Sequence, residues 1–243
     1  ALGGRNTWYS TFDLRSGYHQ VPMHPRDKEK TTFICHRGSF CFRKMPMGLV
    51  NAGATFQRLM DIVLSGLIFE SCIAYLDDII VFSATLEEHL QRVEQMLQRL
   101  VAYKLKLKPS KCRLLQKRVT FLGHIVSENG IETDPAKIEL VKTWKTPANL
   151  SELRSFLGLC SYYRKFVQNY AEVASPLTNL QKKGVRFKWS DDCQLAFDRL
   201  KGALTSAPIL AMPRDEEGIL FILDTDASDH AIGAVLSMRL PDG

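Results

Sequence analysis

The sequence of 243 residues lacks the features that would assign it to a membrane, secreted or zinc-binding class. Its apolar runs fall short of the roughly 20 residues that a bilayer-spanning helix needs. Its first residues, ALGGRNTWYS, contain no initiator Met and none of the basic and apolar regions of a signal peptide. The six cysteines are scattered, without a C-x-x-C pair or histidines at zinc-binding spacing, so we expect reduced thiols in an intracellular protein. The start of the sequence predicts a piece of a longer chain.

Acidic residues are missing from one long segment, Gln95 to Ser127. Its basic residues are Arg99, Lys104, Lys106, Lys108, Lys111, Arg113, Lys117 and Arg118. The segment therefore carries +8, which leaves a net −2 for the remainder of a chain whose total charge is +6. Such a run is either a solvated face or a contact surface for a phosphate backbone, and a local excess of this size favours phosphate contacts.

Internal repeats and low-complexity segments are also lacking, and the apolar periodicity changes type along the chain. Apolar residues from 86 to 100 recur at spacings of three and four, which predicts an amphipathic helix. Asn51 stands where it is able to cap another helix that runs to Val63. Further helices are predicted over 149–167 and 191–204, and short strands over 7–13, 31–43, 117–127 and 218–243. Strands and helices without regular βαβ alternation predict an α+β fold.

Two adjacent aspartates interrupt an apolar run in residues 73–82, IAYLDDIIVF. The flanking residues favour a strand pair, so the stretch predicts a hairpin with Asp77 and Asp78 at its tip. Neighbouring carboxylates repel one another and resist desolvation, so they are stable only when solvated, protonated or bound to a cation. Asp13 also follows an apolar strand. The aspartates are therefore either ordinary turn residues or, brought together by folding, ligands for a pair of Mg²⁺ ions.

Five motifs, in this order, resemble the polymerase motifs of reverse transcriptases from gypsy-type LTR retrotransposons: STFDLRSGYHQV, MPMGLVNAGATFQRLM, YLDDIIVFS, LKPSKC and FLGHIVS. Residues 151–167 resemble the thumb helix of this family, and DTDASDHAIGAVLS resembles the first strand of a ribonuclease H domain. The resemblance implies a right-hand polymerase with a ferredoxin-like palm, a helical thumb, a small α/β tether and a truncated ribonuclease H strand pair. The implied domains are partial fingers and palm in 1–130, thumb in 131–174, connection or tether in 175–217, and the start of a ribonuclease H-like domain in 218–243.

Catalytic and metal-binding roles are implied by the resemblance for Asp13, Asp77 and Asp78. Two Mg²⁺ ions, with Mn²⁺ as a substitute, would stabilise the attacking and leaving oxygens when a primer 3′-hydroxyl attacks a nucleoside triphosphate. The protein then contributes mainly positioning. The implied partners are an RNA or DNA template with its primer, deoxynucleoside triphosphates, and the protease, ribonuclease H and integrase domains of a parent Pol polyprotein. No membrane partner is implied.

The same resemblance implies a nucleotide site formed by Ser16, Gly17, Tyr18, Met47, Gly48 and Lys111. Tyr18 would exclude a 2′-hydroxyl from the sugar pocket, or would be a core aromatic. Lys111 would protonate the leaving pyrophosphate, or would be one more solvated lysine. Two residues depart from the family. It usually has Phe or Gln at the position of Met47, and Pro at the position of Gly53. Because Met is flexible enough to fill the same space, the departures affect the expected fidelity and nucleotide affinity more than activity.

A primer grip is implied for Phe121, Leu122, Gly123 and His124. Nucleic-acid contacts are implied for Lys104, Lys106, Lys108, Arg113, Tyr163 and Arg164. Tyr162 and Tyr163 would face the minor groove of a duplex, although aromatic side chains on a helix also serve packing. Asp226 matches the first carboxylate of a ribonuclease H site, and the remaining carboxylates of that site do not follow in the sequence.

The implied function is that of an RNA-directed DNA polymerase, in a Pol polyprotein whose parent element assembles cytoplasmic virus-like particles. Because the sequence starts shortly before Asp13, we expect the fingers strands to be missing and the 243 residues alone to be inactive. One alternative is a catalytically inactive nucleic-acid-binding remnant. The other is a metal-dependent nuclease built on Asp226.

Overall fold

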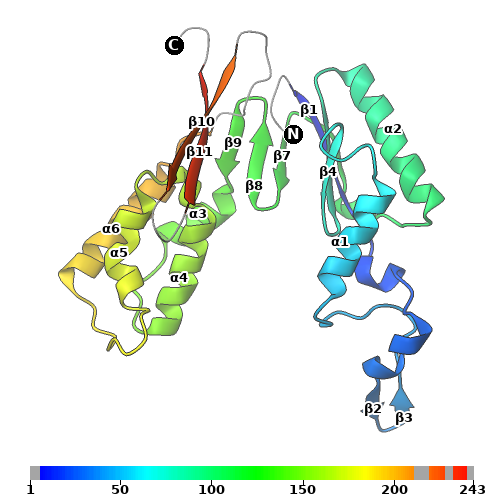
Figure 1. Cartoon of the computed structure of the whole chain (residues 1–243), viewed down its shortest axis with the longest axis horizontal. Coiled ribbons are helices and arrows are strands. Elements are labelled where there is room, and N and C mark those ends of the chain that lie inside the picture. The colour runs from blue at the N-terminus through cyan, green and yellow to red at the C-terminus, as the bar shows by residue number, and fades with distance from the viewer. Residues whose placement is uncertain (1–5, 211–218, 228–231, 240–243) are drawn as a thin grey trace. The chain divides into compact units, whose positions relative to one another are not determined.

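The computed structural model describes residues 6–210, 219–227 and 232–239, which Figure 1 shows as coloured ribbon. They belong to two compact units. One comprises Ala1–Phe121 with Met212–Gly243, and the other comprises Leu122–Ala211. The mixture of helices with antiparallel strands confirms the predicted α+β class.

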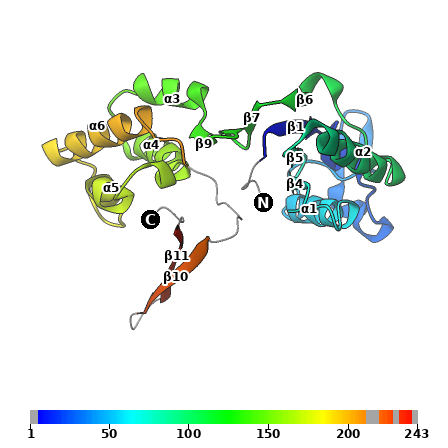
Figure 2. The same ribbon diagram turned by 90° about the horizontal axis from the view of Figure 1, so that it is seen from above.

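An antiparallel sheet of four strands is the centre of the first unit. The strands are β1 (Trp8–Asp13), β4 (Cys72–Tyr75), β5 (Asp78–Ser83) and β6 (Arg113–Gln116), in the order β4-β5-β1-β6. Helices α1 (Ala52–Val63) and α2 (Leu86–Ala102) contribute Phe56, Met60 and Met96 to a core that also contains Phe12 and Ile79 of the sheet (Figures 1 and 2). Asp13 and Asp78 are register partners, so their side chains leave the same face of the sheet, opposite to those of Phe12 and Ile79.

Short elements connect β1 to α1. They are η1 (Gly17–Gln20), η2 (Pro25–Asp27), η3 (Glu29–Thr31), β2 (Phe33–Cys35) and β3 (Gly38–Phe40). The hairpin β2–β3 confirms the predicted strand pair. Its turn requires Gly38, whose φ of 116° is unfavourable for a residue with a side chain.

The start of α1 departs from the prediction in one detail. Asn51 stands at the N-cap position, but its side chain makes no capping hydrogen bond within the described part of the chain. The backbone carbonyl of Asn51 instead accepts from the Thr55 N–H at 2.9 Å. The start of α2 does have a side-chain cap, because the Thr85 hydroxyl accepts from the Glu88 N–H at 3.2 Å while the Glu88 carboxylate accepts from the Ala84 N–H at 3.1 Å.

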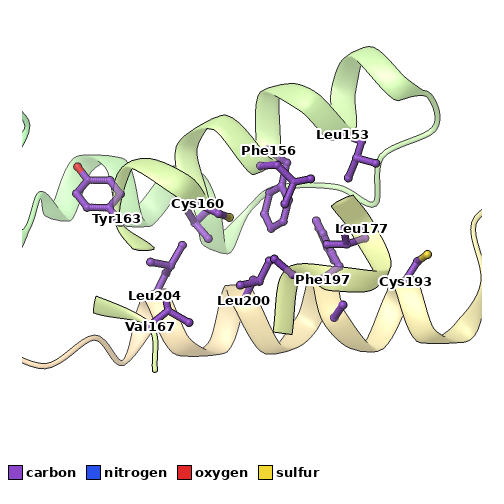
Figure 3. Packing of buried hydrophobic residues seen from close by; sticks show 14 of the residues in the cluster. Leu153, Phe156, Cys160, Tyr163, Val167, Leu177, Cys193, Phe197, Leu200 and Leu204 are labelled. Carbon is purple, nitrogen blue, oxygen red and sulfur yellow. The ribbon is translucent and has the colours of Figure 1, made fainter. Parts of the chain in front are cut away.

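The strand β7 (Arg118–Phe121) ends where the second unit begins along the chain. The second unit consists of β8 (His124–Ser127), β9 (Gly130–Thr133), α3 (Pro135–Lys142), α4 (Leu150–Tyr162), η5 (Arg164–Phe166), α5 (Tyr170–Asn179) and α6 (Asp191–Thr205). Phe156 of α4 packs on Phe197 of α6 with ring centroids 4.5 Å apart (Figure 3). The prediction of a helix over 149–167 was too long, because α4 ends at Tyr162 and the chain continues as η5.

A hairpin of β10 (Leu220–Ala227) and β11 (Ile232–Arg239) confirms the strand pair predicted near the C-terminus, and its predicted turn lies outside the described residues. The remaining short element, η4 (Pro109–Lys111), precedes β6. None of the described helices is long and apolar enough to cross a membrane.

Candidate active site

Backbone pairing brings the three aspartates of the prediction together. The predicted hairpin is present as β4–β5, but its turn is one residue earlier than predicted, at Leu76 and Asp77, and Asp78 begins β5 opposite Asp13. The Leu14 N–H donates to the Asp77 carbonyl at 3.2 Å, which ties the turn to the strand that carries Asp13. The Lys108 N–H donates to the Asp13 carbonyl at 2.8 Å, so the LKPSKC segment runs beside the same strand end.

A glutamine of α1 supports the turn that carries Asp77. Leu76 has a φ of 53°, a left-handed conformation that costs a non-glycine residue free energy. The Gln57 side-chain oxygen accepts from the Leu76 N–H at 2.7 Å, and its amide nitrogen donates to the Ala74 carbonyl at 3.3 Å. The helix therefore fixes the turn through one side chain, a contact that the sequence did not reveal.

Negative charge accumulates at these aspartates, and Lys111 partly offsets it. The Lys111 ammonium lies 2.7 Å from the Asp13 carboxylate. This hydrogen bond and the charge of Asp13 raise the pKa of Lys111 above its usual value. Partial burial, together with the charges of Asp77 and Asp13, raises the pKa of Asp78. A bound cation would relieve the same repulsion.

A cavity of about 530 Å³ opens beside Asp13 and Asp77. Ser16, Met47 and Lys111 are among its other lining residues, so five residues of the predicted site share one cavity. No three Asp, Glu, His or Cys side chains in the described ranges are grouped as metal ligands. The carboxylates nevertheless fit Mg²⁺, because this ion prefers carboxylate oxygens as ligands. In the structure the Asp13 carboxylate forms an ion pair with Lys111.

The residues after Asp13 form a tight bend. Ser16 is exposed and has a φ of 52°, whereas Gly17 is buried. A Cβ on Gly17 would lie 2.9 Å from the Phe56 ring and 3.3 Å from the Asp77 Cβ, so only glycine fits there. Tyr18 is half-buried and meets the Phe56 ring edge-on at 5.4 Å, a position compatible with both of its predicted roles.

The MPMG segment is open to solvent. The Met47 side chain is 70% exposed at the cavity, and Gly48 has a φ of 89° with free space around it. A Cβ on Gly53 would lie 3.7 Å from the Tyr18 hydroxyl, an ordinary contact, so the unusual residues at 47 and 53 leave room in the predicted nucleotide pocket.

Basic side chains in the first unit are exposed, as predicted for phosphate contacts. Lys104, Lys106 and Lys108 lie between α2 and β6, and Arg113 is the first residue of β6. Lys117 instead stacks over the Trp8 ring, 3.6 Å from its centroid. In the second unit Arg164 is exposed at the start of η5.

The predicted primer-grip residues lie at the turn between β7 and β8. Phe121 is buried at the end of β7, Leu122 and Gly123 form the turn, and His124 begins β8. The prediction that Tyr163 contacts nucleic acid needs correction. Tyr163 is only 1% exposed and its hydroxyl donates to the Gly123 carbonyl at 2.6 Å, so it packs inside the unit.

Asp226 lies on β10 opposite Gly233, in an exposed position. The Ala227 N–H donates to its carboxylate at 2.9 Å. Asp226 is not among the residues that line the cavity beside Asp13 and Asp77.

Sequence reasoning also missed a buried histidine. His89 of α2 is fully buried and joins two serines of the sheet, Ser10 at 2.7 Å and Ser83 at 3.0 Å. Ser10 is 79 positions from His89 along the chain, so this bond leaves no local signal in the sequence.

An antiparallel palm with adjacent carboxylates at a strand end and at a hairpin turn defines a right-hand polymerase. The chain belongs to the reverse transcriptase family: the model described as "Reverse transcriptase (RNA-dependent DNA polymerase)" matches residues 2–126. A second model, "RNase H-like domain found in reverse transcriptase", matches residues 189–243. The resemblance found in the sequence is thereby confirmed.

Related proteins include Pol polyproteins of Drosophila melanogaster transposons. The chain is 42% identical over 240 residues to the polyprotein of transposon 297, which covers 97% of the chain and 22% of that protein. It is 36% identical over 247 residues to the polyprotein of transposon gypsy, covering 97% of the chain and 24% of that protein. The chain thus spans less than a quarter of the length of these relatives.

Solved structures support the same fold. The foamy viral protease-reverse transcriptase in complex with double-stranded DNA matches with a TM-score of 0.81 and 26% identity over 93% of this chain and 40% of that chain. The same viral protein in complex with an RNA/DNA hybrid matches with a TM-score of 0.79 and 26% identity over 91% of this chain and 30% of that chain.

Proposed function

We propose that the chain is the polymerase part of a retrotransposon Pol polyprotein that extends a primer on an RNA or DNA template. The observation that carries the proposal is the register pairing of Asp13 with Asp78, beside the turn at Asp77 and next to a cavity that Ser16 and Lys111 also line. The cavity is lined by two carboxylates and by an ammonium group that pairs with one of them, and these charges would suit a metal-bound triphosphate.

Asp13, Asp77 and Asp78 would hold two Mg²⁺ ions, or Mn²⁺ in their place. Bound there, the ions would stabilise charge on the attacking and leaving oxygens. The Lys111 ammonium pairs with the Asp13 carboxylate, and it would meet an anionic leaving group once that carboxylate holds a metal ion. Ser16 exposes a bend of the backbone to the same cavity.

Metal binding can be tested apart from catalysis by titrating the chain with Mn²⁺ and following free Mn²⁺ by electron paramagnetic resonance. We expect Asp13→Asn or Asp77→Asn to weaken binding by at least about tenfold, since each removes a charged oxygen ligand. Lys111→Met should strengthen binding, because its ammonium no longer competes for Asp13. Asp27→Asn, which removes an acid paired with Lys30 on another element, is the matched control. Equal affinities in all variants would contradict the metal assignment.

Polymerase activity is tested in the parent Pol polypeptide with a labelled primer on poly-rA. Asp77→Asn should abolish sustained extension and leave duplex binding nearly intact, because basic residues hold the phosphate backbone. Duplex binding without extension in the wild-type polypeptide would favour the alternative, a catalytically inactive nucleic-acid-binding remnant.

The remaining assignments are part of the same proposal. Nucleotide binding by Met47 is supported by its place in the lining of the cavity, and nucleotide binding by Tyr18 by its contact with Phe56 of α1. Gly48 is proposed as the residue that follows Met47. Deoxynucleoside triphosphates are the proposed substrates, protease and integrase domains the proposed neighbours in the polyprotein, and a cytoplasmic virus-like particle the proposed location. The domain limits at 130, 174 and 217 also stay predictions.

A further inference from the structure

The turn between β7 and β8 has an unfavourable backbone and an unusual set of hydrogen-bond donors. Leu122 and Gly123 have φ values of 45° and 67°, so both lie in the left-handed region. For Leu122 this conformation is unfavourable, because its Cβ crowds the carbonyl. Something beyond the local sequence must therefore stabilise the turn.

Tyrosine hydroxyls from the end of α4 supply that stabilisation. Tyr162 donates to the Leu122 carbonyl, and Tyr163 donates to the Gly123 carbonyl at 2.6 Å. The His124 ring Nδ1 lies 2.9 Å from the Leu122 carbonyl. Because a carbonyl can only accept, Nδ1 is the donor of this hydrogen bond. Both carbonyls of the turn are thus occupied by side chains from outside it.

The rings fix these hydroxyls in place. Tyr162 and Tyr163 meet edge-on with centroids 5.0 Å apart, and the His124 ring lies 5.2 Å from Tyr162 and 5.4 Å from Tyr163. Figure 3 shows Tyr163 at one end of the cluster of buried residues, with its hydroxyl directed away from the side chains of α6. A Cβ on Gly123 would lie 3.5 Å from the Tyr162 ring, so the turn packs closely on both tyrosines.

We propose that Tyr162 and Tyr163 are positioning residues that hold the Leu122–Gly123 turn in the shape that seats a primer terminus. The proposal rests on the proposed polymerase function, which assigns this turn to the primer end. The hydroxyls act through the turn, since each donates its proton to a carbonyl of the turn. Losing them should loosen the primer end while leaving binding of the duplex to the basic residues unchanged.

The first measurement is amide hydrogen exchange at Gly123 and His124 in the free chain. Tyr162→Phe and Tyr163→Phe each delete one hydroxyl and keep the ring, so we expect exchange to accelerate about fivefold for each and further in the double variant. Tyr170→Phe is the matched control. It deletes a tyrosine hydroxyl of α5 that is hydrogen-bonded to the Ser161 side chain of α4 at 2.9 Å, away from the turn. Unchanged exchange at the turn in the double variant would overturn the proposal.

The second measurement uses a primer–template duplex saturated with the 243-residue chain and challenged with a 3′→5′ exonuclease. The wild-type chain and Tyr170→Phe should protect the primer terminus, and the double variant should lose protection severalfold with a duplex affinity within about twofold of wild type. Equal protection by the double variant at equal occupancy would overturn the positioning role. Failure of the wild-type chain to bind the duplex would instead contradict the proposed function, and the positioning role with it.

Discussion

Replacing His89 with Leu tests how the palm is held together. The Ser83 hydroxyl donates to the Thr85 carbonyl at 2.9 Å, so it must accept from His89 Nδ1–H. The Ser10 hydroxyl accepts from the Leu115 N–H at 3.0 Å, so its own proton is free to donate to His89 Nε2. These bonds define a neutral imidazole with its proton on Nδ1.

The expected cost follows from this arrangement. His89→Leu removes two hydrogen bonds, worth about 1 kcal/mol each, and leaves the Ser10 hydroxyl without an acceptor in a fully buried site. We expect the free energy of unfolding to fall by roughly 2–4 kcal/mol, a large part of the roughly 5–15 kcal/mol of an ordinary domain. The exposed His36→Leu is the control and should change it by less than about 0.5 kcal/mol.

The same histidine predicts a pH dependence. Burial, aided by the positive charge of Arg92, lowers the pKa of His89 below its usual 6.5. The unfolded chain therefore takes up the proton first as the pH falls. The contribution of His89 to stability is complete above pH 6.5 and is lost as the pH falls from 6.5 towards the lowered value. His89→Leu should flatten this part of the pH profile.

Urea denaturation followed by Trp8 fluorescence measures both effects in the first unit. Trp144 and Trp189 are replaced by Phe, so that only the tryptophan of β1 reports. A loss of less than about 0.5 kcal/mol, or an unchanged slope below pH 6.5, would show that the serine bonds are not strong and that the reasoning is wrong.

Three further perturbations follow from the candidate site. Gly17→Ala should destabilise the chain by roughly 1–3 kcal/mol, measured by urea denaturation, because its Cβ would lie 2.9 Å from the Phe56 ring; an unchanged midpoint would contradict that packing. Tyr18→Val in the parent polypeptide should raise the use of ribonucleotides relative to deoxyribonucleotides in a competition assay, and an unchanged ratio would make Tyr18 a core residue only. Asp13→Asn should lower primer extension by several orders of magnitude with nearly unchanged duplex affinity, and extension near the wild-type rate would remove Asp13 from the metal site.

Local patterns predicted the elements that carry the site, because hairpins and amphipathic helices are encoded by neighbouring residues. The turn at Asp77 and the helix from Leu86 were both found in this way. The bond between Lys111 and Asp13 joins residues 98 positions apart, and no periodicity predicts such a pair. Tyr163 was misassigned for a related reason: a tyrosine on a helix has the same local sequence whether its hydroxyl meets a phosphate or a distant carbonyl.

The pair of Asp13 and Lys111 has a consequence for stability in the absence of the two proposed metal ions. In many metal sites the ligands carry like charges, and only the bound ion offsets their repulsion. Such proteins unfold when a chelator removes the ion. Here the lysine acts as an internal counter-ion at 2.7 Å. We therefore expect the fold of the palm not to depend on the proposed metal ions. Treatment with EDTA should remove the chemistry and leave the denaturation midpoint where it was.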